Sequence, residues 1–264
     1  MAIPNVEKTS NQKLAVLIDA DNAQSSIIQE LLAEVSRHGV ANVKRAYGDW
    51  TTTNLKGWKE TLHRMAIQPM QQFSYTTGKN STDSSLIIDA MDLLHGGKLD
   101  GFCLVSSDSD FTRLANRIRE AGLFVYGFGE KKTPEAFVAA CDRFVYTEIL
   151  RPQAVEEVKP TTPETQPPSP PLRPMVSQAV VAAAREDSWS SLSLVGSFLL
   201  KTNPSFDPRN YGCQKLGELM RLQKYLEIRE TVASEGGSIH LHVRLKSGKK
   251  SAGELLRGVV SVPD

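Results

Sequence analysis

The sequence lacks the features of a membrane-bound, secreted or disulfide-stabilised protein. No segment approaches the run of about 18 apolar residues that a membrane-spanning helix needs. The residues Met1–Lys13 are polar and interrupted by Pro4, unlike a secretion signal. Only three cysteines occur, far apart and without the paired spacing of a zinc site: Cys103, Cys141 and Cys213. We expect buried, reduced thiols and a cytoplasmic protein with no membrane contact.

Several common catalytic signatures are also missing. There is no nucleophile elbow and no phosphate-binding loop, and Gly127-Phe-Gly129 lacks the remaining glycine of a dinucleotide fingerprint. Strong charge of either sign is absent too, because the formal net charge is only +1. The charge is slightly uneven, since residues 176–264 hold 12 Lys and Arg against 9 Asp and Glu. The C-terminal part is therefore the more natural binder of a polyanion.

Proline, by contrast, is concentrated in one place. Eight of the 14 prolines lie between Pro152 and Pro174, in a stretch with few apolar residues. Proline favours extended backbone and cannot donate a backbone hydrogen bond, so residues 151–175 are predicted to form a semi-rigid linker between two domains. A proline-rich binding site for a protein partner is the alternative interpretation.

Before the linker, short apolar runs alternate with helical patterns. The predicted strands are 14–18, 40–46, 66–73, 101–105, 123–128 and 144–146, and the predicted helices are 27–39, 55–64, 84–95, 111–120 and 134–140. This alternation predicts an α/β domain over residues 12–150, with a parallel sheet that helices cover on both faces.

After the linker the pattern changes. Helical periodicity occurs at 176–184, 192–200 and 211–223, and two short strands at 225–230 and 238–245 flank a Gly236-Gly237 turn. Three helices followed by a hairpin predict a small α+β winged-helix domain over residues 176–247. Residues 248–264 form a tail without a recognisable pattern.

Acidic residues follow two of the predicted strands. Asp19 and Asp21 end the first strand, and Asp108 and Asp110 follow the fourth. Ligands of open parallel sheets bind beyond the carboxyl ends of the strands, where the strand order reverses. If strands one and four are neighbours, these four carboxylates converge, and Asp83 at the start of the preceding helix can reach the same place.

Such a cluster predicts a divalent metal site. Neighbouring carboxylates repel one another unless a cation neutralises them, and hard oxygen ligands favour Mg²⁺ or Mn²⁺. The alternative is that each aspartate caps a following helix, and Asp21 is the weakest candidate ligand. Asn22, Ser106 and Ser107 are expected to contact the ligands or a substrate phosphate.

Three motifs in the N-terminal half resemble those of the NYN domain, a PIN-like nuclease fold, over residues 12–150. The motifs are Val16-Leu-Ile-Asp-Ala-Asp-Asn22, Lys79-Asn-Ser-Thr-Asp83 with Leu86-Ile-Ile-Asp-Ala-Met-Asp92, and Val105-Ser-Ser-Asp-Ser-Asp-Phe111. The resemblance implies that metal binding and phosphodiester hydrolysis depend on Asp19, Asn22, Asp83 and Asp108, with Asp110 as a further ligand.

The C-terminal half resembles the OST-HTH or LOTUS domain. The motifs are Val195-Gly-Ser-Phe-Leu-Leu200, Pro204-Ser-Phe-Asp-Pro-Arg-Asn-Tyr-Gly212 and Lys215-Leu-Gly-Glu-Leu219. This resemblance implies a winged helix that binds RNA or docks a protein. The basic residues near its third helix are candidate phosphate contacts: Arg209, Lys215, Arg221 and Lys224. A solvated helix face is the alternative.

Together these patterns predict an Mg²⁺- or Mn²⁺-dependent ribonuclease with an appended RNA-binding winged helix. Two other functions fit the same residues. The first is an RNA-binding adaptor that has kept the nuclease fold without turnover. The second is a DNA nuclease that uses the same metal chemistry.

Overall fold

The computed structural model describes residues 12–73, 81–151, 171–184, 187–232 and 239–246. The chain divides into two compact units. The first contains residues up to Pro171 together with Leu199–Gly212, and the second contains Leu172–Phe198 together with residues from Cys213 onward. Most of the predicted linker and the whole predicted tail lie outside the described residues.

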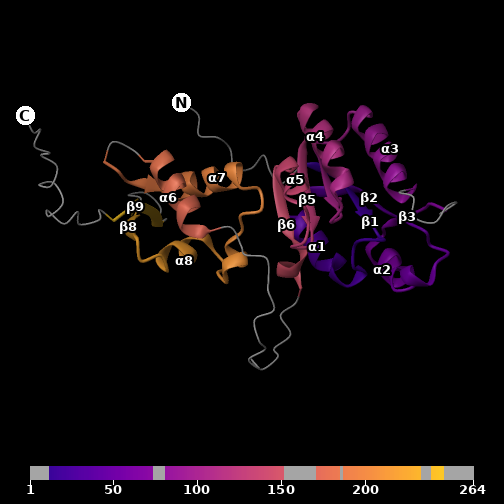
Figure 1. The fold of residues 1–264 in the computed structure, drawn as a ribbon, viewed down its shortest axis with the longest axis horizontal. Coiled ribbons are helices and arrows are strands. Elements are labelled where there is room, and N and C mark those ends of the chain that lie inside the picture. The colour runs from indigo at the N-terminus through magenta and orange to yellow at the C-terminus, as the bar shows by residue number, and fades with distance from the viewer. Residues whose placement is uncertain (1–11, 74–80, 152–170, 185–186, 233–238, 247–264) are drawn as a thin grey trace, which may run out of the picture. The chain divides into compact units, whose positions relative to one another are not determined.

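The first unit is built on a six-stranded sheet (Figure 1). Its strands are β1 (Lys13–Asp19), β2 (Val40–Gly48), β3 (Gln68–Gln71), β4 (Gly101–Val105), β5 (Phe124–Gly129) and β6 (Arg143–Tyr146). Their order is β3-β2-β1-β4-β5-β6, and every neighbouring pair is parallel. The predicted α/β class is confirmed, and β1 and β4 are neighbours.

Helices cover both faces of this sheet (Figure 1). They are α1 (Ile28–Val35), α2 (Trp58–Met65), α3 (Ser81–His95), α4 (Thr112–Glu120) and α5 (Glu135–Ala140). Successive residues of a strand point to opposite faces. Val16 and Ile18 of β1 therefore pack with α1 and α2, while Ala15 and Leu17 pack with α3, α4 and α5. Both faces of β1 are buried, which explains its unbroken apolar run.

Three helices of the first unit differ by three or more residues from their predicted bounds. α1 ends at Val35 and does not reach Gly39. α3 begins at Ser81, three residues before the predicted start at Ser84. Its first turn is polar, so the apolar periodicity that predicted the helix does not extend to it. Asp83 consequently lies inside the first turn of α3. α2 begins only at Trp58, because Thr53–Leu55 form a separate 3₁₀ turn.

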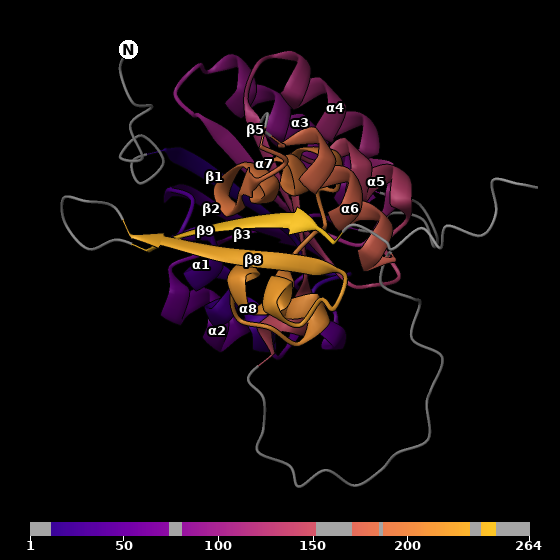
Figure 2. The same ribbon diagram turned by 90° about the vertical axis from the view of Figure 1, so that its left-hand side faces the viewer.

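The second unit combines helices with a small antiparallel sheet of order β7-β9-β8 (Figure 2). The elements after the linker are α6 (Leu172–Ala182), β7 (Ser190–Ser191), α7 (Leu192–Thr202), α8 (Leu216–Arg221), β8 (Leu226–Val232) and β9 (Ile239–Leu245). The predicted small C-terminal α+β domain is confirmed. Strand β7 was not predicted, because two serines carry no strand periodicity. The predicted Gly236-Gly237 turn lies outside the described residues.

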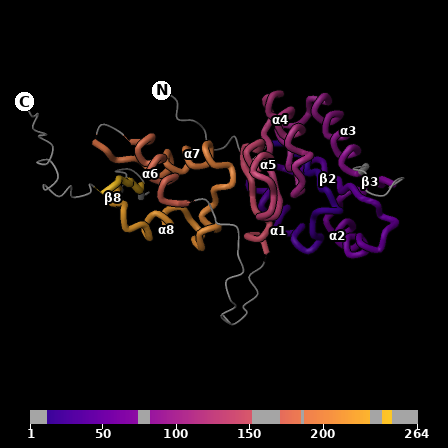
Figure 3. The backbone as a smooth tube through the Cα atoms, viewed as in Figure 1, coloured from indigo at the N-terminus to yellow at the C-terminus, as the bar shows by residue number. Residues whose placement is uncertain are grey.

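The third helix of this region is shorter than predicted. Residues 208–211 form a 3₁₀ turn, and the residue after it, Gly212, has a φ of 76°. α8 begins only at Leu216. A positive φ is easily adopted only by glycine, so the helix pattern that starts at Tyr211 cannot continue through Gly212. α6 is longer than predicted, because it already begins at Leu172. Figure 3 traces the backbone through these elements.

The core of the second unit is built from helices α6, α7 and α8 and from strands β8 and β9. The buried side chains are Val176, Ala179, Val180, Val195, Leu219, Met220, Leu226 and Val243. Cys103, Cys141 and Cys213 are buried and not disulfide-bonded, as predicted. Within the described parts of the chain, we find no helix both long and apolar enough to cross a membrane.

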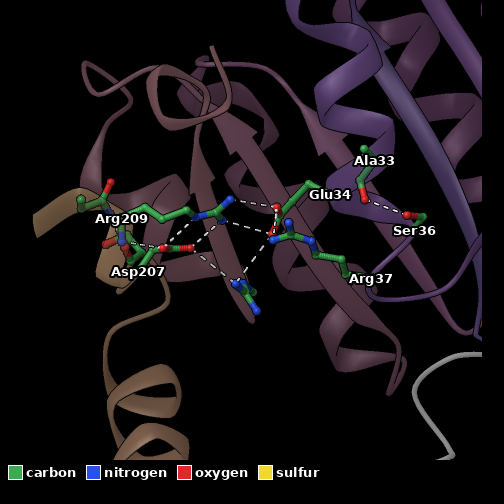
Figure 4. Close-up of polar contacts among 9 residues, drawn as sticks. Ala33, Glu34, Ser36, Arg37, Asp207 and Arg209 are labelled. Atoms are coloured by element: carbon green, nitrogen blue, oxygen red, sulfur yellow. Dashed lines mark hydrogen bonds and ion pairs between the residues drawn. The ribbon is translucent and has the colours of Figure 1, made fainter. Parts of the chain in front are cut away.

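Residues 199–212 belong to the first unit. They contact the rest of that unit through a buried ion cluster (Figure 4). The guanidinium of Arg209 donates to both carboxylate oxygens of Glu34, at 3.0 and 3.2 Å, and to both oxygens of Asp207, at 2.7 and 3.0 Å. Glu34 and Asp207 are only 3% and 5% exposed. A backbone hydrogen bond of 2.8 Å from Phe144 to Pro204 lies in the same unit.

The cluster is held together by charge-assisted hydrogen bonds. Burial alone would raise the pKa of Asp207, but hydrogen bonds from the side chain and backbone of Arg209 outweigh it, and the pKa is lowered. The hydrogen bond with Asp207 likewise raises the pKa of Arg209, despite its burial. Arg209 therefore neutralises two buried carboxylates at once.

Candidate metal centre

The candidate centre lies at the carboxyl edge of the sheet, between β1 and β4. Asp19 is the last residue of β1, and Ser106, Ser107 and Asp108 directly follow β4. Ile18 pairs with Val105, so the two strands end side by side. The strand order reverses between β1 and β4, which is where ligands of open α/β sheets bind.

Three acidic side chains meet at this edge. One carboxylate oxygen each from Asp83, Asp108 and Asp110 lies within 4.8 Å of the others. Asp83 and Asp108 are half-buried and Asp110 is exposed. Among the described residues, this group has the oxygen donors and the spacing to hold a divalent cation such as Mg²⁺ or Mn²⁺.

Asp19 lies deeper than the other carboxylates. Its side chain is 1% exposed, and one of its oxygens accepts hydrogen bonds from Asn22 Nδ2 at 2.8 Å and from Ser106 Oγ at 2.7 Å. Burial raises its pKa, and these hydrogen bonds oppose the rise. The sequence predicted that Asn22 and Ser106 contact the ligands or a phosphate, and the structure shows both side chains bonded to Asp19.

The loop after β4 positions Asp108. The hydroxyl of Ser106 accepts from the backbone N–H of Asp108 at 3.1 Å, and Asp108 Oδ1 accepts from the backbone N–H of Asp110 at 2.9 Å. Asp108 thus caps the 3₁₀ turn Ser109–Phe111, as the alternative interpretation of the strand-end aspartates expected. The cap uses only one carboxylate oxygen, and the other can still bind a cation.

Asp21 connects this edge to α3. Its carboxylate accepts a hydrogen bond of 3.1 Å from the hydroxyl of Thr82, next to Asp83 in the first turn of the helix. The side chain of Asp21 is exposed and lies outside the three-carboxylate group. Thr82 had no assigned role in the sequence, although its place beside Asp83 in the motif was visible.

The end of β5 supports the same loop. Ser107 Oγ accepts a hydrogen bond of 2.8 Å from the backbone N–H of Glu130. Gly129 approaches so closely that an added Cβ would lie 2.6 Å from the Ser106 carbonyl oxygen. Asn22, Ser107 and Glu130 also line a narrow crevice at this edge. Sequence reasoning missed Gly129 and Glu130, because nothing local marks a glycine as a site of close approach.

The electrostatics of the centre favour a cation. Burial raises the pKa of Asp83 to about 6, and the negative charges of Asp19, Asp108 and Asp110 add to this effect. A carboxyl group whose negative form is destabilised in this way is stabilised again by a bound cation.

The metal-free protein should therefore become less stable as Asp83 ionises. The pKa of Asp83 is about 6 in the folded protein, above the ordinary aspartate value of 3.8, so the free energy of unfolding should fall as the pH rises through this interval. In EDTA at pH 7, Asp83→Asn should be more stable than the wild type by about 1 kcal/mol, after allowance for solvent screening. The difference should vanish below pH 4. Urea unfolding at several pH values measures it.

Two observations would check this prediction further. Mg²⁺ should stabilise the wild type but not the variant, because only the wild type has the full set of ligands. Asp92→Asn removes an exposed carboxylate from the same helix and should change neither result. Equal stability of wild type and Asp83→Asn at pH 7 would contradict the prediction.

The predicted nucleic-acid contacts of the C-terminal region differ in accessibility. Arg209 is 18% exposed and bonded to two carboxylates, as described above. Arg221 is 50% exposed and forms an ion pair with Glu230. Lys215 and Lys224 are exposed. Arg209 is thus the least accessible of the four to a phosphate.

The two regions match two known domain families. Residues 13–150 match the NYN domain, and residues 166–236 match the OST-HTH/LOTUS domain. No curated protein matches the chain.

Several solved structures are similar to parts of the chain. A protein of unknown function from Vibrio parahaemolyticus is 18% identical, with a TM-score of 0.44, and the match covers 55% of this chain and 96% of that protein. A protein from Chromobacterium violaceum, solved by NMR, is 35% identical over 33% of this chain and 94% of its own, with a TM-score of 0.26. An uncharacterised protein from Nitrosomonas europaea is 24% identical over 35% of this chain and 94% of its own, with a TM-score of 0.27.

Proposed function

The chain belongs to the NYN domain family, and from this premise we propose that it is a divalent-metal-dependent ribonuclease that hydrolyses RNA phosphodiester bonds. NYN domains are nucleases, and their family match covers more than half of the 264 residues. The observation that carries the proposal is the meeting of Asp83, Asp108 and Asp110 within 4.8 Å where the strand order reverses. A structural cap does not require three carboxylates from two separate segments to converge.

In this proposal, each acidic residue has a distinct role. Asp83, Asp108 and Asp110 hold the cation, which would be Mg²⁺ or Mn²⁺. When bound, such an ion activates water and stabilises negative charge on the phosphate oxygens. Asp19 lies beneath the ligands and contributes a buried negative charge. Asn22 and Ser106 keep that carboxylate in place through the two hydrogen bonds to it.

RNA is the favoured substrate because of the second domain. OST-HTH domains bind RNA, and this family matches residues 166–236. The exposed Lys215 and Lys224 supply positive charge in that region. Near the acidic group, Asn22 and Ser107 line the crevice at the sheet edge and can contact a substrate phosphate.

The proposal predicts cleavage that requires a divalent metal. Purified full-length protein, incubated with end-labelled single-stranded or structured RNA, should yield shorter products in Mg²⁺ or Mn²⁺ and none in EDTA, because the carboxylates cannot activate water without the ion. Denaturing gel electrophoresis measures the products. DNA of the same sequence, treated in parallel, is the control for substrate class.

Other outcomes would support the alternatives. Preferential cleavage of the DNA would indicate a DNA nuclease on the same fold. Binding of RNA that survives EDTA, with no products in either metal, would indicate an RNA-binding adaptor and overturn the ribonuclease proposal.

A further inference from the structure

The sheet of the second unit has one packed face and one open face. Leu226 and Val243 point into the core and are 5% and 1% exposed. Residues adjacent to them along β8 and β9 point the opposite way, because side chains alternate along a strand. Figure 2 shows β8 and β9 crossing the front of this unit with no described helix drawn over them.

The open face is polar and rich in nitrogen donors. The strand register places Glu227 opposite Arg244, Arg229 opposite His242, and Thr231 opposite His240. All six side chains therefore share the open face, where residues paired across an antiparallel ladder lie on the same side. We call these six residues, together with Trp189, the open sheet face.

Trp189 orders the two arginines of this face. Ser190 pairs with Val243 in β9, so Trp189 lies beside Arg244 on the open side. The guanidinium carbons of Arg229 and Arg244 both lie over the indole ring, each 4.6 Å from its centroid. Two like charges that converge on one ring suit an anion, and here the carboxylates of Asp187 and Glu227 each lie beside one of them.

Both arginines keep the capacity to bind an anion. Their side chains are 48% and 41% exposed. Arg229 approaches Asp187 only to 3.7 Å, which is too long for a hydrogen bond, so this contact leaves its N–H donors available. Arg244 Nε donates a hydrogen bond of 2.6 Å to Glu227 Oε2, and one terminal nitrogen of the same guanidinium lies 2.6 Å from that oxygen as an ion pair. Its other terminal nitrogen is not used in this pair.

We propose that the open sheet face binds the phosphate backbone of single-stranded RNA, with Arg229 and Arg244 as the phosphate contacts and Trp189 as the residue that positions them. Planar guanidinium groups match phosphate oxygens in pairs, and stacking on an aromatic ring fixes their orientation before binding. His240, His242 and Thr231 extend the row of donors along the strands. The inference rests on the proposed RNA-binding role of the second domain and assigns that role to a surface.

This assignment differs from the surface suggested by the sequence. Arg221 and Lys224 lie in or just after α8. Glu230, the partner of Arg221, is paired with Leu241 and therefore belongs to the opposite side of the sheet from Arg229. The two surfaces can be tested against each other, because each holds two exposed cations.

The test is the affinity of the full-length protein for fluorescein-labelled oligouridylate, measured by anisotropy in EDTA at several salt concentrations. The double variant Arg229→Gln/Arg244→Gln should bind at least about 10-fold more weakly. The slope of log affinity against log salt should also become shallower by about 1.4, because each lost phosphate contact on a single strand changes it by about 0.7. The matched control Arg221→Gln/Lys224→Gln removes the same charge and should change affinity less than threefold.

Two further variants separate positioning from charge. Trp189→Leu should weaken binding at every salt concentration and leave the slope unchanged, since both cations remain. Arg229→Lys/Arg244→Lys keeps the charge and loses the planar groups, so its affinity should lie between those of the wild type and the glutamine pair. If the glutamine pair does not fold, as judged by its unfolding temperature, the lysine pair and Trp189→Leu provide the comparison.

The outcomes distinguish this inference from the ribonuclease proposal. Unchanged affinity and slope in the folded glutamine pair, or a larger loss in the Arg221/Lys224 control, would overturn the open sheet face as the RNA site. Metal-dependent cleavage by the same variants would then still support the ribonuclease. Loss of binding in the glutamine pair alone, with unchanged Mg²⁺ stabilisation of the fold, would support the inference.

Discussion

Asp108→Asn is expected to lower the rate of metal-dependent RNA cleavage by more than about 100-fold, because mutation of a residue that only supports a metal ligand already costs about 10- to 100-fold. Asp108 lies in the loop that follows β4 and belongs to the three-carboxylate group with Asp83 and Asp110. The substitution removes a negative charge and one oxygen donor but nearly preserves the shape of the side chain. Single-turnover cleavage of labelled RNA in saturating Mg²⁺ measures the rate.

The control for this experiment is Asp92→Asn. Asp92 is an exposed carboxylate on α3, the helix that also carries Asp83, and it lies outside the metal group. Its rate should stay within about twofold of the wild type, as expected for surface substitutions away from the site. RNA affinity in EDTA should be unchanged in both variants. Cleavage by Asp108→Asn at the wild-type rate would show that the metal site is elsewhere or that Asp108 is only a cap.

Arg209→Ala is expected to destabilise the first unit by about 3–5 kcal/mol, because it removes the guanidinium that hydrogen-bonds to two buried carboxylates. These carboxylates then keep only the exposed Arg37 on Glu34 and the more distant Arg143, at 3.9 Å from Glu34 and 3.6 Å from Asp207. Glu34 and Asp207 are nearly inaccessible to water, and the guanidinium of Arg209 lies between them (Figure 4). Urea unfolding measures the loss. A Trp189→Phe background leaves Trp50 and Trp58, both in the first unit, as the fluorescent reporters.

Arg37 offers a matched control at the same cluster. It also contacts Glu34, at 2.9 Å, but its side chain is 66% exposed. Arg37→Ala should therefore cost less than about 1 kcal/mol, as is usual for an exposed ion pair. Adding Glu34→Gln to Arg209→Ala should recover part of the loss, since one buried charge is then removed. Equal effects of the two arginine substitutions would contradict the interpretation of Arg209 as the neutralising residue.

The sequence by itself determined the elements and the position of the acidic residues along them. Residues 14–18 and 101–105 form continuous apolar runs, and such runs specify buried strands because both faces must avoid water. The structure places β1 and β4 there, and β4 has the predicted bounds. These patterns are local, since they depend only on which neighbours along the chain are apolar. For the same reason, the sequence showed that Asp19 and Asp108 lie at the carboxyl ends of strands.

Only the tertiary structure decided which of these residues meet. Pairing of β1 with β4 joins segments that are far apart in the chain. From the sequence alone, this pairing was only the condition under which the carboxylates would converge. The depth of Asp19 and the bonding of Asn22 and Ser106 to it depend on how the loop after β4 closes over the sheet edge. Likewise, Arg209 carried a charge that suggested phosphate binding, and its two buried partners became visible only in the fold. Burial and partner choice are set by contacts between distant segments, and the local pattern of one segment does not contain them.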